Sequence, residues 1–434
     1  MPHPPIAVPE VGGDEITKIE ATEKAFDTAA EDIADYDPET IVVISPHNTM
    51  YRDAFYIAKN DGGTGDLKRF NAPKPHVYYP YDTELADEIV RLCDEYGIPV
   101  VYSEEDSDEL DHGTTVPLYF VNRRIPPVGG DTAAYKIVRI APSLQGDDVL
   151  YDMGYLIERA IAHTGRRAVI IASGDLSHKL KEDGPYGYIK EGPEFDKAVT
   201  DVMKSGNLED FTLIDEKVND RSANCGYPGF VMLAGALQDY KVTSDLLSYE
   251  GPFGVGYGIC IFDCENWYVR LARMSLETYI RTGRRLEKHM IQQFPDFLRR
   301  EKAGVFVCIK KHGQLRGCIG TILPYYDTTF EETCELAISA GTGDPRFEAV
   351  TASELDELVY TVDVMGQPES ATRDMLDEKR YGVIVTKGNR RGLLLPDLEG
   401  VDSVEEQLAI SCSKGGISPL EDYDIERFTV ERHT

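Results

Sequence analysis

The first 264 residues alternate between two patterns of apolar residues. Between residues 14 and 36, apolar side chains recur at helical intervals with acidic ones between them, which predicts an amphipathic helix. The run TIVVI at 40–44 is β-branched, which is typical of a strand buried in a parallel sheet. Strands that alternate with helices predict an α/β domain around a largely parallel sheet. The further expected strands are 97–102, 135–140 and 167–173, and the further expected helices are 82–96, 147–163 and 194–204.

Two glycine-rich stretches complete this first part of the chain. We expect residues 61–65 to form a surface loop. The segment SYEGPFGVGYGICIF at 248–262 is expected to form a strand that closes the domain. An α/β sheet places its ligand site at the carboxyl ends of its strands, in the loops. His47 ends one predicted strand in this sense, and His178 lies just beyond another.

The pattern changes after residue 264. A helix is expected at about 266–281, followed by strands at VFVCIKK, QLRGCIGT and LVYTVDVM. The segment YGVIVTKGNRRGLLLP and a helix at about 404–413 follow. This order predicts an α+β domain. We therefore expect two domains, at residues 1–264 and 265–434, which suits a chain too long for one hydrophobic core.

Composition and charge narrow the classes of partner. Hydrophobic residues make up 42% and charged residues 28%, as in globular proteins, and the net charge is −31 with a pI near 4.6. Such a surface repels phosphate backbones and anionic lipid, so we expect neither nucleic acid nor a membrane as partner. No apolar run is long enough to span a bilayer, and the first residues lack the regions of a signal peptide. The eight cysteines form no CxxC pair, so we expect reduced thiols and a cytoplasmic protein.

Four histidines lie in loop contexts at presumed strand ends. They are His3 in MPHPP, His47 in ISPHN, His112 in ELDHGTTVPL and His178 in SGDLSHKL. A non-haem iron site needs two His and a third protein ligand on one face, with positions left open for substrate and O₂. Other His can then orient the substrate and move protons, because His titrates near neutral pH. Each one alone is more often a surface or loop histidine; together they indicate a site.

These segments occur in the order and rough spacing of the class III extradiol dioxygenases. The region from about Met1 to Cys264 resembles that LigB-like family, most specifically through DHGTTVPLYF and IASGDLSHKL. The resemblance implies that His3 and His47 bind a metal, ferrous iron in that family. It also implies that His178 is the acid/base group and that His112 orients the substrate. The polar neighbours Asp111, Asp175 and Ser177 in the two motifs are expected to support these groups.

The third metal ligand departs from the dioxygenase pattern. Those enzymes place a Glu ahead of a glycine-containing helix, and the matching segment RSANCGYPGFVMLAGAL offers Cys225 instead. A Cys at this place is similar to the MEMO proteins, which share the fold and hold a metal with two His and one Cys. A thiolate is softer than a carboxylate and favours copper or zinc over ferrous iron. A small buried helix residue is the plainer interpretation of Cys225.

The second domain resembles the AMMECR family through LRGCIG, GDPRF, YGVIV, RRGLLLP and a KGGI segment. Within QLRGCIGT, Gly317 and Gly320 are expected to allow close backbone approach or a bulge. Arg316 and Cys318 carry the reactive groups of this motif. An Arg holds carboxylate or phosphate with two hydrogen bonds, and a thiol can attack or bind metal. A purely structural role for the whole motif is the alternative.

The fused arrangement resembles the protein A family of the AmmeMemoRadiSam system, in which such a chain accompanies a radical SAM enzyme. The leading hypothesis is an oxidoreductase: a metal-dependent, extradiol-dioxygenase-like enzyme acting on an aromatic or modified small molecule. The alternative is a non-catalytic metal-binding or scaffold protein of the same system. Cys225 favours the alternative, whereas the presence of both His112 and His178 favours the enzyme.

Overall fold

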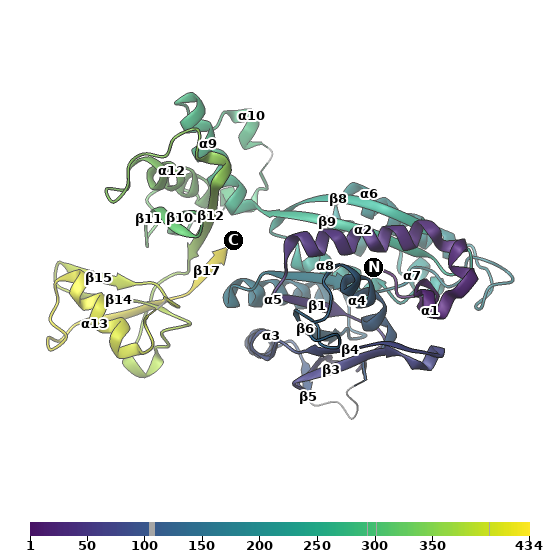
Figure 1. The fold of residues 1–434 in the computed structure, drawn as a ribbon. Coiled ribbons are helices and arrows are strands. Elements are labelled where there is room, and N and C mark those ends of the chain that lie inside the picture. Colours follow the sequence, from purple (N-terminus) through teal and green to yellow (C-terminus); the bar gives the residue numbers. More distant parts are fainter. Residues whose placement is uncertain (104–108, 293, 301, 399) are drawn as a thin grey trace. The chain divides into compact units, whose positions relative to one another are not determined.

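The fold is described from a computed structural model, shown in Figure 1. The structure describes residues 1–103, 109–292, 294–300, 302–398 and 400–434. The chain divides into two compact units, Met1–Cys264 and Glu265–Thr434, which are treated separately below. Among the described residues, no helix has both the length and the apolar character that crossing a membrane requires.

The central element of unit 1 is a five-stranded sheet in the order β5-β2-β6-β1-β7. β1 (Thr40–Ile44) runs parallel to both of its neighbours, β6 (Lys136–Ala141) and β7 (Ala168–Ala172). β2 (Phe55–Ala58) is parallel to β5 (Val100–Ser103) but antiparallel to β6. The sheet is therefore mixed and largely parallel, which confirms the α/β prediction.

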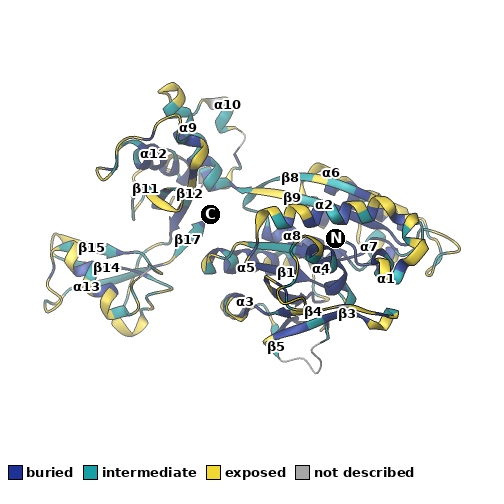
Figure 2. Cartoon of the chain, in the orientation of Figure 1, coloured by how far each residue is buried: buried dark blue, intermediate teal, exposed yellow. Residues whose placement is uncertain are grey.

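Each face of this sheet packs on its own hydrophobic core. Val42 and Ile44 of β1 point into a core shared with α3 (Thr83–Tyr96), α5 (Asp147–Thr164) and α8 (Tyr227–Ala236). Ile41 and Val43 point to the opposite face, where α4 (His112–Arg124) and β4 (Ala72–Pro80) contribute Leu118 and Tyr79. Figure 2 shows β1 and α8 in dark blue, as expected for elements enclosed on all sides. Alternating side chains of one strand thus hold helices on both faces, and the loops at the strand ends remain free for a site.

Two sequence predictions for unit 1 were wrong. Gly62–Leu67 is a strand, β3, paired with β4 (Ala72–Pro80), and is not a surface loop. A Cβ at Gly62 would lie 2.4 Å from the Tyr78 hydroxyl, so glycine at this position allows the close approach of the Tyr78 side chain and does not mark a loop. The segment 248–262 is not one strand, because it contains the end of β8 (Tyr240–Glu250), a turn and the first part of β9 (Tyr257–Asn266).

The four helices predicted for unit 1 are all present as α2, α3, α5 and α6, whereas α1, α4, α7 and α8 were not predicted from the pattern. The expected helix at 14–36 is divided into a 3-10 turn, Gly13–Ile19, and α2, which runs along β8 (Figure 1). α3 begins after Asp82, whose carboxylate accepts a hydrogen bond from the Leu85 amide, and ends at Gly97 in the left-handed region. The helices are α1 (Pro9–Gly12), α2 (Glu20–Tyr36), α3 (Thr83–Tyr96), α4 (His112–Arg124), α5 (Asp147–Thr164), α6 (Glu191–Ser205), α7 (Glu216–Ser222) and α8 (Tyr227–Ala236).

Unit 2 contains two four-stranded sheets, in the orders β11-β10-β12-β17 and β13-β16-β14-β15. The strand pairs of both sheets are antiparallel throughout the described residues. Helices α9 and α12 pack on the first sheet, and α13 packs on β14 and β15 of the second. This arrangement confirms the α+β prediction for the second part of the chain.

The sequence pattern did not predict α10, α11, α12, β13 or the last two strands of unit 2. The helices are α9 (Trp267–Thr282), α10 (Lys288–Ile291), α11 (Phe297–Arg300), α12 (Thr329–Thr342) and α13 (Val404–Gly415). The strands are β10 (Val305–Lys311), β11 (Gln314–Gly320), β12 (Leu358–Met365), β13 (Glu369–Ser370), β14 (Gly382–Lys387), β15 (Arg390–Leu394), β16 (Asp424–Phe428) and β17 (Val430–His433).

Candidate metal centre

The predicted site residues meet at the carboxyl ends of β1 and β7. The two strands are parallel, and Ile44 lies opposite Ala172, so their following loops leave the same edge of the sheet. His47 lies in the loop after β1, and His178 lies in the loop after β7. The amino group of Met1 donates to the Ala172 carbonyl at 2.9 Å, which brings the N-terminal segment to this edge as well.

His3 is buried, with 2% of its surface exposed, and its ring orientation is fixed. Its Nδ1 lies 2.9 Å from the Ser173 hydroxyl oxygen, and that hydroxyl donates its own proton to the Gly113 carbonyl at 2.5 Å. Because a hydroxyl has one proton to donate, Nδ1 of His3 is the donor toward Ser173. Burial and the nearby His47 hold the pKa of His3 well below its usual range. Nε2 therefore carries a free lone pair, which is what a metal ligand needs.

His47 directs its Nε2 toward the same point. The Nε2 atoms of His3 and His47 are 3.0 Å apart, and the two rings are nearly perpendicular, at 78°. Two nitrogens bound to one ion at about 2.1 Å lie about 3.0 Å apart if their bonds make a right angle, and about 3.4 Å apart in a tetrahedron. The pair therefore fits a shared ion.

His112 joins these two rings in a cluster whose ligand atoms all lie within 4.8 Å of one another. Its ring, however, stacks on that of His47, with 4.2 Å between centroids and 28° between planes. A metal lies in the plane of each imidazole that binds it, and stacked planes do not meet at bonding distance. Burial and the two other imidazoles lower the pKa of His112 to about 4, so the ring is neutral at pH 7. His112 is therefore better suited to contact a molecule bound beside the metal than to be a metal ligand.

Cys225 places a sulfur near His3, outside the cluster of the three imidazoles. Its Sγ lies 3.5 Å from His3 Nε2, and a nitrogen and a sulfur bound to one tetrahedral ion lie about 3.6 Å apart. The Asp175 amide donates to this sulfur at 3.3 Å and holds it in place just ahead of α8. Burial and Asp175 raise the pKa of the Cys225 thiol. A bound cation is therefore needed to make it a thiolate at neutral pH.

His178 lies close to both Cys225 and Asp175. Its Nε2 lies 4.0 Å from Cys225 Sγ and 4.0 Å from Asp175 Oδ2. Burial lowers the pKa of His178, although Asp175 opposes the change. Burial also raises the pKa of Asp175, whose Oδ1 accepts a hydrogen bond from the His3 amide at 2.9 Å. A neutral imidazole beside the proposed metal ligand Cys225 is suited to accept a proton from a bound molecule.

The side chains of Asp111 and Ser177 form hydrogen bonds with backbone groups around the site. Asp111 caps α4 by accepting from the Thr114 amide at 3.0 Å, and it pairs with the buried Arg139 at 3.2 Å. The Ser177 hydroxyl donates to the Ser222 carbonyl at 2.9 Å, which joins the loop of His178 to the segment that leads to Cys225. Neither side chain touches an imidazole through a hydrogen bond among the contacts described.

Sequence reasoning missed Ser173 and Arg139. Ser173 ends the run RAVIIAS and gives no signal that distinguishes it from any other strand-ending serine. Arg139 did give a signal, because a charged residue inside the buried strand KIVRIA must have a partner. That partner is Asp111, and the Arg139 guanidinium also donates to the Asn48 side chain at 2.9 Å.

Ser173→Ala is expected to lower metal affinity by about 10- to 100-fold, because the hydrogen bond that fixes the His3 tautomer is lost. The measurement is competition for zinc between the purified protein and a chromophoric chelator. Ser143→Ala is the matched control, since Ser143 is a buried serine whose contacts, with Gln145, lie outside the site. Equal affinities of the Ser173→Ala variant and the unchanged protein would show that Ser173 does not orient the ligand.

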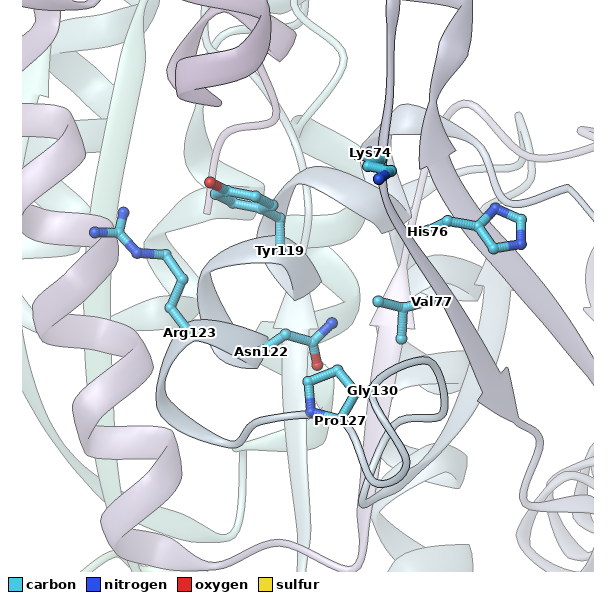
Figure 3. A pocket seen from close by; sticks show the side chains of 8 residues that line it. All are labelled: Lys74, His76, Val77, Tyr119, Asn122, Arg123, Pro127 and Gly130. Atoms are coloured by element: carbon cyan, nitrogen blue, oxygen red, sulfur yellow. The ribbon is translucent and has the colours of Figure 1, made fainter.

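A surface pocket of about 470 Å³ lies elsewhere on unit 1 and has no part in this site. Figure 3 shows it between β4, which contributes Lys74 and His76, and the second half of α4, with Tyr119 and Arg123. His112 begins α4, so seven residues of helix, about 10 Å, separate it from Tyr119. The imidazole cluster and Cys225 do not line this pocket.

The LRGCIG motif of unit 2 lies in the edge strand β11. The Arg316 guanidinium donates two hydrogen bonds to the Glu354 carboxylate, at 3.0 and 3.2 Å. The carboxylate that Arg316 holds is therefore one of the protein's own. A Cβ on Gly317 would lie 2.1 Å from the Ala340 carbonyl oxygen, and one on Gly320 would lie 2.1 Å from the Phe306 ring. Both glycines therefore serve close approach, by α12 and by β10. The Cys318 thiol is half-buried.

Two known protein families match the chain, one over each of its two parts. A sequence model of the family described as the catalytic LigB subunit of aromatic ring-opening dioxygenase matches residues 1–260. This chain belongs to the LigB family. A model of the AMMECR1 family matches residues 269–433, so the LigB-family region is fused to an AMMECR1 domain, as the sequence motifs indicated. The pair His3 and His47 thus lies in a region related to a metal-dependent dioxygenase subunit.

Individual relatives cover the chain to different extents. A Clostridium acetobutylicum protein is 43% identical over 469 aligned residues, covering 100% of this chain and 98% of that relative. A Thermotoga maritima protein is 49% identical over 173 residues, covering 39% of this chain and 98% of its own length. A solved structure of a Pyrococcus horikoshii protein is 37% identical, covers 38% of this chain and 88% of that chain, and superposes with a TM-score of 0.35.

Proposed function

We propose that the LigB-family unit is a metal-dependent enzyme that acts on an aromatic or similarly modified small molecule. His3, His47 and Cys225 would bind one transition-metal ion, His178 would transfer a proton, and His112 would orient the substrate. The observation that carries the proposal is the position of His3 Nε2, 3.0 Å from His47 Nε2 and 3.5 Å from Cys225 Sγ. When bound, the ion would supply a Lewis acid and an attachment point for substrate or O₂.

The donor set favours soft or borderline ions. Two neutral imidazoles and one thiolate suit copper(I) or zinc, whereas the ferrous iron of extradiol dioxygenases is usually held by two His and a carboxylate. The Asp175 carboxylate lies beside these ligands, but its Oδ1 accepts the His3 amide hydrogen bond. We therefore expect copper or zinc to be retained more firmly than iron.

Two aromatic side chains lie beside the imidazoles that are proposed to act on the substrate. Phe70 lies edge-on to His112, with 5.6 Å between ring centroids, and Tyr186 lies 5.1 Å from the His178 ring. Aromatic rings beside two neutral imidazoles can pack against a flat molecule whose hydroxyls face the nitrogens. His178 would accept a hydroxyl proton from such a molecule, and the buried carboxyl of Asp175 would stabilise the charged imidazolium that results.

A spectroscopic titration tests the enzyme proposal. 4-Nitrocatechol is a suitable probe, because its visible absorption changes when its hydroxyls lose protons. We expect the iron-loaded or zinc-loaded full chain to bind it in deprotonated form, and His178→Asn to weaken binding about tenfold or more through the lost hydrogen bond. His163→Asn is the control, since His163 lies on α5 and pairs with Glu88 away from the site.

The competing function, a non-catalytic metal-binding or scaffold protein, is favoured by Cys225. A sulfur in place of the carboxylate is compatible with a site that holds a metal without activating O₂. Metal-loaded protein that binds no 4-nitrocatechol, or that binds it equally well as His178→Asn, would contradict the enzyme proposal and support the scaffold. From the resemblance of the fused arrangement alone, we also propose that a radical SAM enzyme acts in the same pathway.

A further inference from the structure

Two cysteines of unit 2 lie directly opposite each other on neighbouring strands. Cys308 of β10 pairs in register with Cys318 of β11, and these strands are adjacent in Figure 1. Val307 and Ile309, which flank Cys308, are buried in the core beneath α9 and α12. Because side chains alternate along a strand, both thiols lie on the other face of the sheet. Both are half-buried.

The backbone contacts of Cys318 show which type of cross-strand pair this is. Its amide donates to Asp344 Oδ2 at 2.9 Å, and its carbonyl accepts from Arg346 Nη2 at 3.1 Å. Both backbone groups therefore point away from β10, so Cys308 and Cys318 form a non-hydrogen-bonded pair. In such pairs the Cα atoms lie about 4.5 Å apart and the side chains are close. This separation is at the short end of the range that a disulfide spans, about 4.4 to 6.8 Å.

The surroundings make Cys308 the more reactive thiol. A hydrogen bond from the Cys318 thiol lowers the pKa of Cys308, and the positive charges of Lys310 and Arg432 act in the same direction. The same hydrogen bond, together with burial, raises the pKa of Cys318. Burial and the Asp363 carboxylate oppose the lowering of the Cys308 pKa, and Asp363 is itself paired with Arg432 at 2.9 Å. A thiolate is the nucleophile in disulfide exchange, so Cys308 is suited to attack first.

We propose that Cys308 and Cys318 form a thiol–disulfide exchange site that is oxidised by low-molecular-weight disulfides. The Cys308 thiolate attacks one sulfur of the disulfide, forms a mixed disulfide and releases the other half as a thiol. Cys318, after losing its proton, attacks the Cys308 sulfur and releases the second thiol. The protein loses two electrons and two protons, and the small disulfide gains them. A cross-strand disulfide at this short separation is strained, which makes it readily reducible.

Oxidised glutathione serves as the probe in the test. The full chain is incubated with mixtures of oxidised and reduced glutathione, the remaining thiols are alkylated, and peptides are analysed by mass spectrometry. We expect a disulfide that joins the peptides of Cys308 and Cys318, without lasting glutathionylation. In Cys318→Ser we expect the mixed disulfide on Cys308 to accumulate, because the second attack is lost. The Cys308 thiol should react at least about 100-fold faster than that of Cys334, whose pKa is raised by burial to about 12.

Cys334→Ser is the matched control, since Cys334 is a half-buried cysteine of the same unit. It should form the Cys308–Cys318 disulfide as the unchanged protein does, and circular dichroism should show that all variants are folded. Two results would overturn the proposal. One is that both thiols of the unchanged protein stay reduced in oxidising glutathione. The other is that glutathione remains on Cys308 although Cys318 is present.

Discussion

His3→Asn is expected to lower metal affinity by more than about 100-fold, a larger loss than removal of a supporting hydrogen bond produces. The reason is that His3 Nε2 is the atom that both other proposed ligands approach, His47 Nε2 at 3.0 Å and Cys225 Sγ at 3.5 Å. Asparagine keeps a polar group beside Ser173 while removing the metal-directed nitrogen. Competition with a chromophoric chelator for zinc or copper measures the change.

His76→Asn is the control for this variant, because His76 is exposed on β4 and belongs to the separate pocket. It should bind metal as the unchanged protein does. Thermal unfolding should be recorded for both variants, since His3 is buried and its replacement also disturbs packing. If His3→Asn is folded and retains the metal at full affinity, His3 is not a ligand.

Cys225→Glu is expected to shift the preference of the site from zinc toward ferrous iron by about tenfold or more, since a carboxylate replaces a soft thiolate. The unchanged protein is expected to cleave simple catechols weakly or not at all, and its thiolate is exposed to oxidation beside O₂. Cys225 is half-buried just ahead of α8. Metal competition and O₂ consumption with protocatechuate measure the two effects.

Cys225→Ser separates loss of the thiolate from gain of a carboxylate. It should weaken binding of zinc and copper and should not improve binding of iron. Rapid cleavage of protocatechuate by the unchanged iron-loaded protein would contradict this prediction, because it would mean that Cys225 does not impair ferrous chemistry. Circular dichroism shows whether Cys225→Glu is folded. If it is not, metal binding is compared between Cys225→Ser and the unchanged protein.

Much of the fold followed from the apolar pattern. The run TIVVI and the run RAVIIAS each gave a strand, and the rule that α/β sites lie at carboxyl strand ends correctly brought His47 and His178 to one edge. The pattern did not show which strands are neighbours. β2 has four residues, and β3 is rich in glycine, so neither carries the signal of a buried strand. Their places depend on tertiary contacts, such as Tyr78 over Gly62.

The site was less predictable than the sheet. Nothing in the residues MPHPP shows that Met1 is anchored to Ala172 or that His3 is buried. His3 and Cys225 were assigned through resemblance to a family and not through spacing. The stacking of His112 on His47, which separates an orienting role from a ligand role, is a property of ring planes that a sequence does not contain.

The most direct test of the central claim is X-ray absorption spectroscopy on the zinc-loaded full chain. Two imidazole nitrogens and one thiolate at one ion predict a sulfur scatterer at about 2.3 Å and nitrogen scatterers at about 2.0 to 2.1 Å. The sulfur contribution should disappear in Cys225→Ser while the imidazole contribution remains. A spectrum of the unchanged protein with three imidazoles and no sulfur would contradict the account, and would assign the third position to His112.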